Sequence, residues 1–305
     1  EKGKELVIYF RRHRFWPLAH RGSVAAGLRY KSELAMVEPW YFSRKMASLF
    51  PNQASLSKGV TPDLVREACL KGWLPISPLF NRGSKVLTVG SCFAEELRNY
   101  FLTHDISTEV VFVPPGLNNT FALRSYFRWI ETGLAEDQEM WFEQAAGGGV
   151  KWKPDIERSV LLETFKDLDC IVLTVGLAEI WEDNKTNKVF WRGVPRNLYD
   201  PDRHICRLSS TEENIGNLVA AITSLRSIAP KAEIILSLSP IPLKATQTGV
   251  SCVTADCLSK SVLRVAIASV MEKKLERVRY WPSFEIVRWL SGHVEKSFFG
   301  EDGSS

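Results

Sequence analysis

Short apolar runs alternate with longer stretches of helical periodicity along most of this chain. Each run has the length of a buried strand, and each longer stretch places apolar residues three and four positions apart, as on one face of a helix. Such alternation predicts a mainly parallel sheet with helices on both faces. We therefore expect a three-layer α/β/α sandwich with a five-stranded sheet. The predicted strands are residues 85–89, 109–113, 169–175, 233–238 and 277–281, and the predicted helices are residues 93–103, 120–132, 210–228 and 255–274.

Local signals mark two further features of this pattern. Residues 210–213 (STEE) form a capping box that starts a helix, and Pro230 ends it. Residues 147–149 are three glycines between Trp141 and Trp152. They predict either a hairpin that could act as a lid or a plain surface turn.

The first part of the chain differs in character from the rest. Residues 10–16 (FRRHRFW) could contact phosphates or anionic lipid, or could lie on a solvated helix whose aromatic side chains pack on the main domain. Residues 63–72 have the pattern of a short amphipathic helix. We expect an N-terminal extension over residues 1–82 and an α/β domain over residues 83–305.

Composition narrows the classes of partner. A chain of 305 residues with 45% apolar content can bury a full core, and a net charge of +4 does not favour nucleic acid. We find no membrane-spanning run and no signal peptide, so we expect a cytoplasmic protein, although a chain that begins with Glu1 leaves an upstream targeting segment open. The six cysteines show no Cys-x-x-Cys spacing, so no metal or cofactor is expected.

A serine follows the first predicted strand of the domain. Residues 85–94 read KVLTVGSCFA, in which an apolar strand leads to Gly90, a turn residue, and then to the start of a helix. In open α/β sheets, ligands bind outside the carboxyl ends of the strands, where helix N-termini present free N–H groups. Ser91 is therefore a candidate nucleophile, and the alternative is that it only caps the helix. Cys92, at the same helix terminus, is the second candidate.

The motif at residues 90–94 resembles the signature of the GSCFA family, which is similar to the wider SGNH or GDSL hydrolases. The resemblance spans roughly residues 82–305 and implies a flavodoxin-like fold, a bacterial protein and a serine esterase. It continues, in the family's order, through residues 115–120, 175–181, 204–210, 239–243 and 280–285.

The resemblance also implies an oxyanion hole. In SGNH-like enzymes the donors are the N–H of the nucleophile, a glycine N–H and an asparagine side chain. Here these would be Ser91, Gly116 and either Asn118 or Asn119. We expect one of the two asparagines only to form a turn and to cap the helix at Thr120.

Glu179 departs from the superfamily's pattern. Residues 176–179 read GLAE where Gly-x-Asn-Asp is expected, and an ionised carboxylate cannot donate a hydrogen bond. Glu179 could be protonated through burial, orient a base or bind a substrate hydroxyl. It could equally form a salt bridge to Arg192, Arg196 or Arg207.

The sequence does not identify one residue as the catalytic base. The superfamily's Asp-x-x-His block lies near the C-terminus, where this chain has Asp302 but no later histidine. We expect that the histidine follows Ser305, which would leave the chain as given nearly inactive. Otherwise His293 or His204 is the base.

The predicted substrate is an acylated carbohydrate. The segment from Trp191 to Arg207 combines aromatic rings with the guanidinium groups of several arginines. This combination suits the binding of a sugar that bears acidic groups. The resemblance implies bacterial polysaccharide metabolism, so we expect removal of an O-acyl group, such as acetyl, from a glycan. An O-acyltransferase and a non-catalytic glycan-binding module are the alternatives. The four predicted substrate contacts are Arg192, Arg196, His204 and Arg207.

Overall fold

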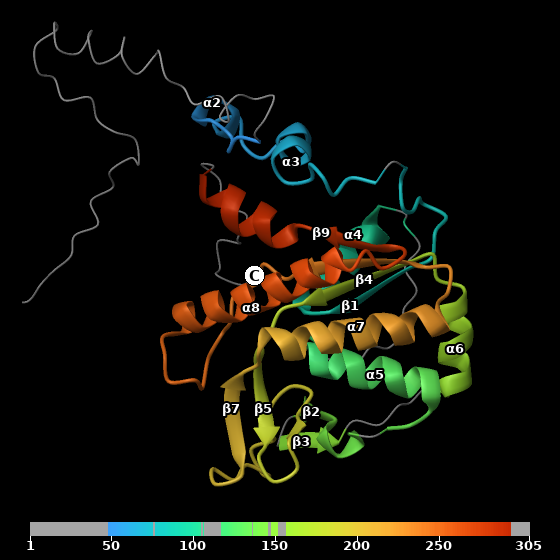
Figure 1. Ribbon diagram of the computed structural model, residues 1–305, viewed down its shortest axis with the longest axis vertical. Helices are drawn as coiled ribbons and strands as arrows, with labels where there is room; N and C mark the ends of the chain where they lie inside the picture. The colour runs from blue at the N-terminus through green and yellow to red at the C-terminus, as the bar shows by residue number, and fades with distance from the viewer. Residues whose placement is uncertain are drawn as a thin grey trace, which may run out of the picture. The chain divides into compact units, whose positions relative to one another are not determined.

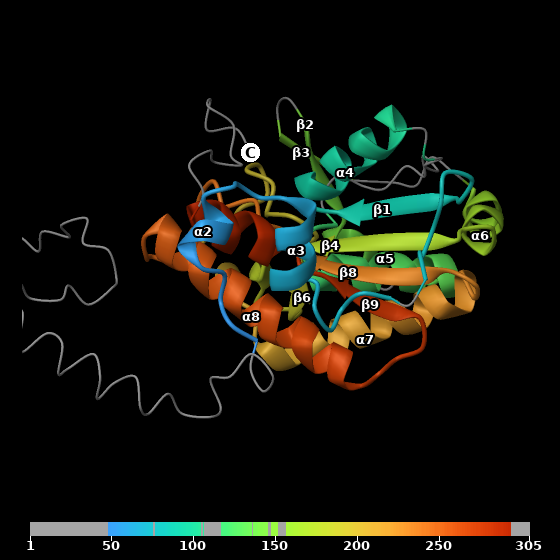
Figure 2. The ribbon, with the colours of Figure 1, turned by 90° about the horizontal axis from the view of Figure 1, so that it is seen from above.

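Four parallel strands form the central sheet in the computed structural model of this chain (Figure 1). The structure describes residues 48–75, 77–104, 106, 117–135, 137–145, 148–151 and 157–293. The strands lie side by side in the order β1 (Val86–Gly90), β4 (Cys170–Val175), β8 (Glu233–Leu238) and β9 (Val278–Trp281), as Figure 2 shows.

The central strand β4 is buried along its whole length, as its continuous apolar run predicts. It pairs in parallel register with β1 on one side and β8 on the other, so that Gly90 lies opposite Thr174 and Thr174 opposite Ser237. The carboxyl ends of the three strands therefore meet at one edge of the sheet.

Helices cover both faces of the sheet. On one face, alternate strand residues such as Leu87 and Ile171 pack in the large core with α5 (Thr120–Thr132), α6 (Arg158–Lys166), α7 (Thr211–Ile228) and α8 (Cys252–Glu272). On the other face, Val172 and Ile235 share a second core with Phe101 of α4 (Cys92–Thr103). These layers confirm the predicted three-layer α/β fold.

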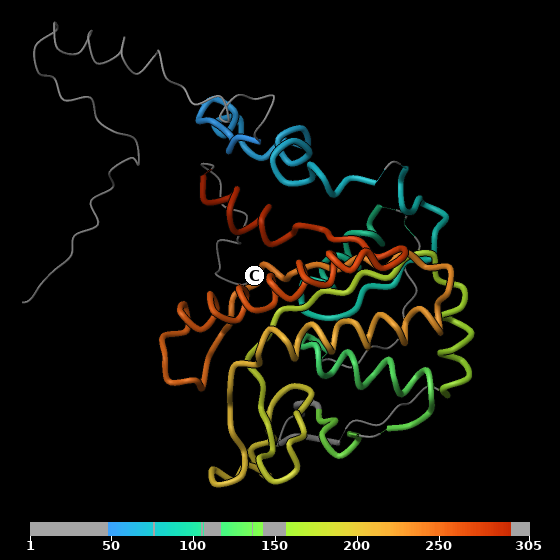
Figure 3. Tube along the Cα trace, viewed as in Figure 1, coloured from blue at the N-terminus to red at the C-terminus, as the bar shows by residue number. Residues whose placement is uncertain are grey.

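A separate antiparallel sheet follows β4 along the chain. Its strands lie in the order β6 (Lys188–Val189), β5 (Glu179–Asp183) and β7 (His204–Leu208). After η2 (Gln138–Met140), β2 (Phe142–Ala145) pairs antiparallel with β3 (Gly148–Lys151). A hairpin is therefore present at the three glycines, and its action as a lid stays a prediction. The path of β5 and β7 can be followed in Figure 3.

Short helical segments lie before β1 and after β9. They are α2 (Gln53–Leu56), α3 (Pro62–Ala68), the π-helix η3 (Glu285–Leu290) and η4 (Ser291–His293). Leu290 of η3 packs with Leu56 of α2 and Leu64 of α3. The segments before β1 and after β9 therefore share a small apolar cluster. The compact unit that holds the sheet begins at Pro51. The predicted boundary at residue 82 stays a prediction.

The predicted elements agree with the described ones. Four of the five predicted strands and all four predicted helices are present within a few residues of their expected ends, and α3 matches the predicted helix at residues 63–72. The capping box is confirmed, because Ser210 Oγ accepts from Glu213 N and Glu213 Oε2 accepts from Ser210 N. The fifth predicted strand, residues 109–113, and the basic aromatic segment at residues 10–16 lie outside the described residues. No described helix combines the length and apolar character needed to cross a membrane.

Candidate functional site

Gly90 brings β1 close enough to β4 for the chain to turn directly into α4. Its φ of 130° lies in a region that favours glycine. A Cβ at this position would lie 1.9 Å from the carbonyl oxygen of Thr174, which is far inside van der Waals contact. The glycine thus allows Ser91 to stand at the carboxyl edge of the sheet and at the N-terminus of α4.

The Ser91 hydroxyl does not cap α4, although the residue occupies the N-cap position. Its Oγ lies 2.9 Å from Thr174 Oγ1. The Ser91 N–H also donates to Thr174, at 2.9 Å to Oγ1 and 3.2 Å to the carbonyl oxygen. Because Thr174 Oγ1 accepts that N–H, its own proton is available to donate to Ser91 Oγ. The alternative that Ser91 serves only as a side-chain cap is not what the structure shows.

Asn118 and Gly176 join the loop after β4 to the segment before α5. The carbonyl oxygen of Asn118 accepts from the N–H groups of Gly176, at 2.9 Å, and Leu177, at 3.2 Å. A Cβ on Gly176 would lie 3.4 Å from Ser91 Cβ and 3.2 Å from Ser239 Cβ. Residues that follow β1, β4 and β8 therefore converge on one small region with Asn118.

The two asparagines have different surroundings. Asn119 is buried, its Oδ1 accepts from Ala122 N at 2.9 Å as the cap of α5, and its Nδ2 donates to the carbonyl oxygen of Trp191 at 2.7 Å. Asn118 Oδ1 is buried and has no hydrogen-bond partner among the described residues. The expectation that one asparagine would only form a turn and a cap is met by Asn119. Gly116 and Asp302, the other predicted site residues near these blocks, lie outside the described residues.

Glu179 accepts hydrogen bonds from a loop between β8 and α8. Its Oε2 accepts from Thr246 Oγ1 at 2.5 Å, and its Oε1 accepts from Gln247 N at 3.2 Å and from Cys206 Sγ at 3.3 Å. Burial, with the negative charge of Glu179, raises the pKa of the Cys206 thiol to about 12. The carboxylate thus joins β5 to β7 and to the loop between β8 and α8.

Arg207 and His204 are held within the antiparallel sheet. Arg207 binds Glu182 and Glu213, and the hydrogen bond to Glu213 raises its pKa further above the usual arginine range. His204 is buried, and its Nδ1 accepts from the N–H of Asp200 at 3.1 Å. Both side chains therefore have structural partners. No described hydrogen bond links either of them to Ser91.

The remaining predicted residues are exposed. Arg192 and Arg196 follow β6, His293 is at the end of η4, and Cys92 is the first residue of α4. All six cysteines are free thiols. Among the described residues, no group of three histidine, cysteine or carboxylate side chains is placed to hold a metal ion.

Lys260 is the residue that the sequence analysis missed. Its side chain is 2% exposed, and its Nζ donates to the carbonyl oxygen of Gly176 at 2.7 Å. Burial lowers the pKa of Lys260 to about 8, against the opposing effect of Asp256 and with a smaller contribution from Arg288. The signal that could have found it is the helical stripe of α8, in which position 260 falls among the buried positions 256, 259, 263 and 267.

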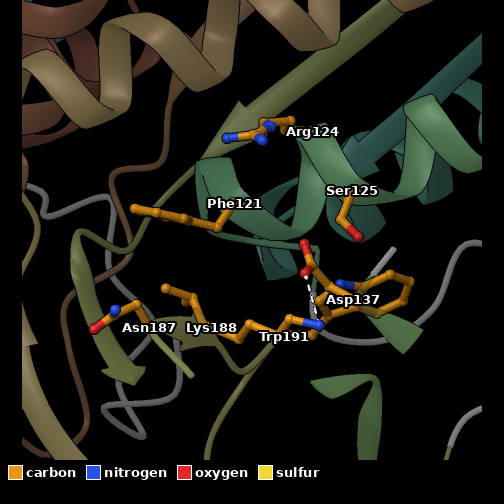
Figure 4. Close-up of a pocket in the computed structure, with 8 residues that line it drawn as sticks. Phe121, Arg124, Ser125, Asp137, Asn187, Lys188 and Trp191 are labelled. Atoms are coloured by element: carbon orange, nitrogen blue, oxygen red, sulfur yellow. Dashed lines mark ion pairs between the residues drawn. The ribbon is translucent and has the colours of Figure 1, made fainter. Parts of the chain in front are cut away.

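A cavity of about 200 Å³ lies between α5 and the β6 region (Figure 4). Phe121 and Arg124 of α5 line this cavity, and Lys188 of β6 lines it from the facing side. Lys188 Nζ lies 3.8 Å from Asp137 Oδ1. Trp191 forms part of the wall, and its carbonyl oxygen accepts the bond from Asn119 described above. Asn119, which contacts Trp191 in the cavity wall, directly follows Asn118, which contacts Gly176.

Comparisons with known proteins cover the α/β domain. The model of the GSCFA family matches residues 85–305, which begin one residue before β1 and contain every residue of the Ser91 region. The comparison with curated proteins found no match.

Proposed function

The chain belongs to the GSCFA family, and we propose that it is a serine acyl hydrolase whose nucleophile is Ser91. The observation that carries the proposal is that the Ser91 hydroxyl makes no capping hydrogen bond to α4 and lies instead 2.9 Å from Thr174 Oγ1. A serine that a fold needs only as a cap would accept a bond from the first turn of its helix. Ser91 is partly exposed at the edge where three strands end, so a substrate can reach its hydroxyl.

The proposed reaction is acyl transfer from a substrate ester to Ser91 and then to water. Ser91 Oγ attacks the ester carbonyl, and the carbonyl oxygen acquires negative charge that N–H donors must stabilise. The Ser91 N–H is already donating to Thr174. We therefore assign the donors to the N–H groups of Cys92 and Phe93, the first two residues of α4, and to Asn118; the next N–H, that of Ala94, already donates to the carbonyl oxygen of Ser91 at 2.8 Å. Rotation of the Asn118 amide would place Nδ2 where the unpartnered Oδ1 now lies.

The proposed substrate is an O-acylated glycan. Support comes from the cavity of Figure 4, whose lining includes Phe121 and Arg124, groups that suit a sugar with acidic substituents, beside Lys188 and the Asp137 carboxylate with which it pairs. The proposal requires that a sugar bound in this cavity extends far enough to present an ester group to Ser91. Arg192 and Arg196 are exposed in the same part of the chain and are proposed as further contacts.

Hydrolysis of p-nitrophenyl acetate and of an O-acetylated polysaccharide tests the proposal. We expect Ser91→Ala to abolish acetate release from both, and Cys92→Ala to retain it, because the neighbouring thiol is the only other nucleophile suggested at this helix terminus. Acetate release that survives in Ser91→Ala would contradict the proposal. Acetyl appearing on an added sugar instead of in water would assign the same site to an acyltransferase.

A further inference from the structure

We propose that Lys260 is the base that removes the proton from Ser91. This inference rests on the proposed function, and it assigns the base to α8. From the sequence alone, the candidates for the base are His293, His204 and a histidine after Ser305.

The first argument is position. The point at which a Cβ of Gly176 would stand is 3.4 Å from Ser91 Cβ and 3.7 Å from Lys260 Nζ. Both side chains therefore border the same small space, and a residue larger than glycine at position 176 would fill it. Ser91 Oγ and Lys260 Nζ are attached to rotatable side chains, and we expect rotation of these side chains to bring the two atoms into contact.

The second argument is hydrogen-bond capacity. A lysine ammonium has three N–H donors, and in the described residues the hydrogen-bond acceptor of Lys260 Nζ is the carbonyl oxygen of Gly176. The neutral amine can keep that bond and direct its lone pair at the Ser91 hydroxyl. Thr174 supports this direction, because a Thr174 hydroxyl that donates to Ser91 Oγ leaves the Ser91 proton for the amine.

The third argument is the charge around Lys260. Asp256 lies one helical turn away, but its Oδ2 binds Arg288 and its Oδ1 accepts from Leu243 N at 3.1 Å. An ammonium that is buried without its own carboxylate is destabilised relative to the neutral amine. This agrees with the lowered pKa of Lys260, which makes a substantial fraction of the amine neutral near pH 8.

The proton balance is complete with these groups alone. As Ser91 Oγ forms its bond to the ester carbon, the Ser91 proton moves to Lys260 Nζ. The resulting ammonium gives that proton to the leaving alcohol oxygen as the ester bond breaks. Water then attacks the acyl-serine, its proton passes to Nζ, and Nζ returns a proton to Ser91 Oγ when the acid departs. Serine and lysine form such a pair in known variants of the serine triad.

A purely structural role for Lys260 is the competing explanation, because its bond to Gly176 anchors the loop after β4. Ser259 provides a matched comparison. It is the adjacent residue of the same helix, and its Oγ anchors Ala178 of the same loop by accepting from Ala178 N at 2.8 Å. A variant of Ser259 removes a loop anchor without removing a base.

The test measures how fast a fluorophosphonate labels Ser91 in the full chain from about pH 6 to about pH 10, a range that brackets the titration of Lys260. We expect the wild-type rate to rise to a plateau with a midpoint near the Lys260 pKa of about 8. Lys260→Arg keeps the charge but cannot act as a base, and Lys260→Met keeps the length without the charge. Both should label at least about 100-fold more slowly and lose the midpoint, whereas Ser259→Ala should keep it.

The outcomes separate the two proposals. Labelling of Ser91 that is as fast and as pH-dependent in Lys260→Arg as in the wild type would overturn the role of Lys260 and leave the nucleophile intact. A wild-type chain whose Ser91 is never labelled would overturn both proposals. If the Lys260 variants do not fold, as thermal unfolding would reveal, Gly176→Ala decides. Its methyl group would stand between Ser91 and Lys260, so labelling at the wild-type rate would contradict the inference.

Discussion

The hydroxyl groups of Ser91 and Thr174 lie 2.9 Å apart, and the Ser91 N–H donates to the same Thr174 oxygen. Thr174 is fully buried on β4, whereas Ser91 is partly exposed at the edge. One rigid side chain on the central strand therefore orients both the backbone and the hydroxyl of the proposed nucleophile. The relationship is set by the register of β1 and β4, in which Gly90 lies opposite Thr174.

Thr174→Val tests whether this orientation matters for reactivity. Valine has nearly the shape of threonine but cannot bond to Ser91, so we expect acetate release to fall by roughly 10-fold and the free energy of unfolding to fall by about 1 to 2 kcal/mol. Thr174→Ser, which keeps the hydroxyl, should retain most of the activity. Rate measurements and urea unfolding check both effects. Full activity in Thr174→Val would show that the Thr174 hydroxyl has no catalytic importance.

The two neighbouring asparagines should separate stability from activity. Asn119→Ala removes the cap of α5 and a buried bond to Trp191, and we expect it to lower the free energy of unfolding by about 1 to 2 kcal/mol. Asn118→Ala should change stability by less than about 0.5 kcal/mol. It should also lower kcat/KM by roughly 100-fold, as the loss of an oxyanion donor does. Chemical unfolding and ester hydrolysis are the measurements. If the two roles are exchanged, Asn118→Ala will lower the free energy of unfolding and Asn119→Ala will lower kcat/KM.

An ion pair between a buried carboxylate and a partly exposed arginine predicts a specific pH dependence of stability. Asp183 is fully buried, and the hydrogen bond from Arg203 holds the pKa of its carboxyl well below the usual range. A lowered folded-state pKa contributes stability above the ordinary aspartate pKa of about 4, and that contribution is lost as the pH falls from there. Arg203→Met should therefore destabilise the protein most at neutral pH.

The difference in stability between Arg203→Met and the wild type should narrow as the pH falls below about 4, because the wild type then loses the contribution that the variant already lacks. Urea unfolding of both proteins across this range is the measurement. Arg196→Met, at an exposed position, is the control and should follow the wild type at every pH. A difference that stays constant down to low pH would show that Asp183 does not titrate as described.

The place of Ser91 after β1, and a cap at one of the two asparagines, were predictable from the sequence because they depend on local chemistry; the choice of Asn119 over Asn118 was not. An apolar run followed by glycine predicts where β1 ends, and an asparagine before a helical pattern predicts a cap. Lys260 was not predictable in this way. A lysine in an amphipathic helix is ordinarily solvated, and only the packing of α8 against the Gly176 loop shows that this one is buried.

The antiparallel sheet was missed for a different reason. The β5 sequence EIWED carries three acidic residues and no apolar run, so periodicity does not distinguish it from a loop. Its stability comes from pairing with β7 about 25 residues later and from partners such as Arg203 for Asp183. Such long-range pairing cannot be deduced from local propensity.

Identifying the acylated residue tests the central claim most directly. The full chain is mixed with p-nitrophenyl acetate, the reaction is stopped with acid within its first turnover, and the acetylated peptide is located by mass spectrometry. The account predicts one acetyl group on Ser91 and none at that position in Ser91→Ala. Acetyl groups found on Cys92, or no acetylated residue while p-nitrophenol is released, would contradict the assignment of Ser91 as the nucleophile.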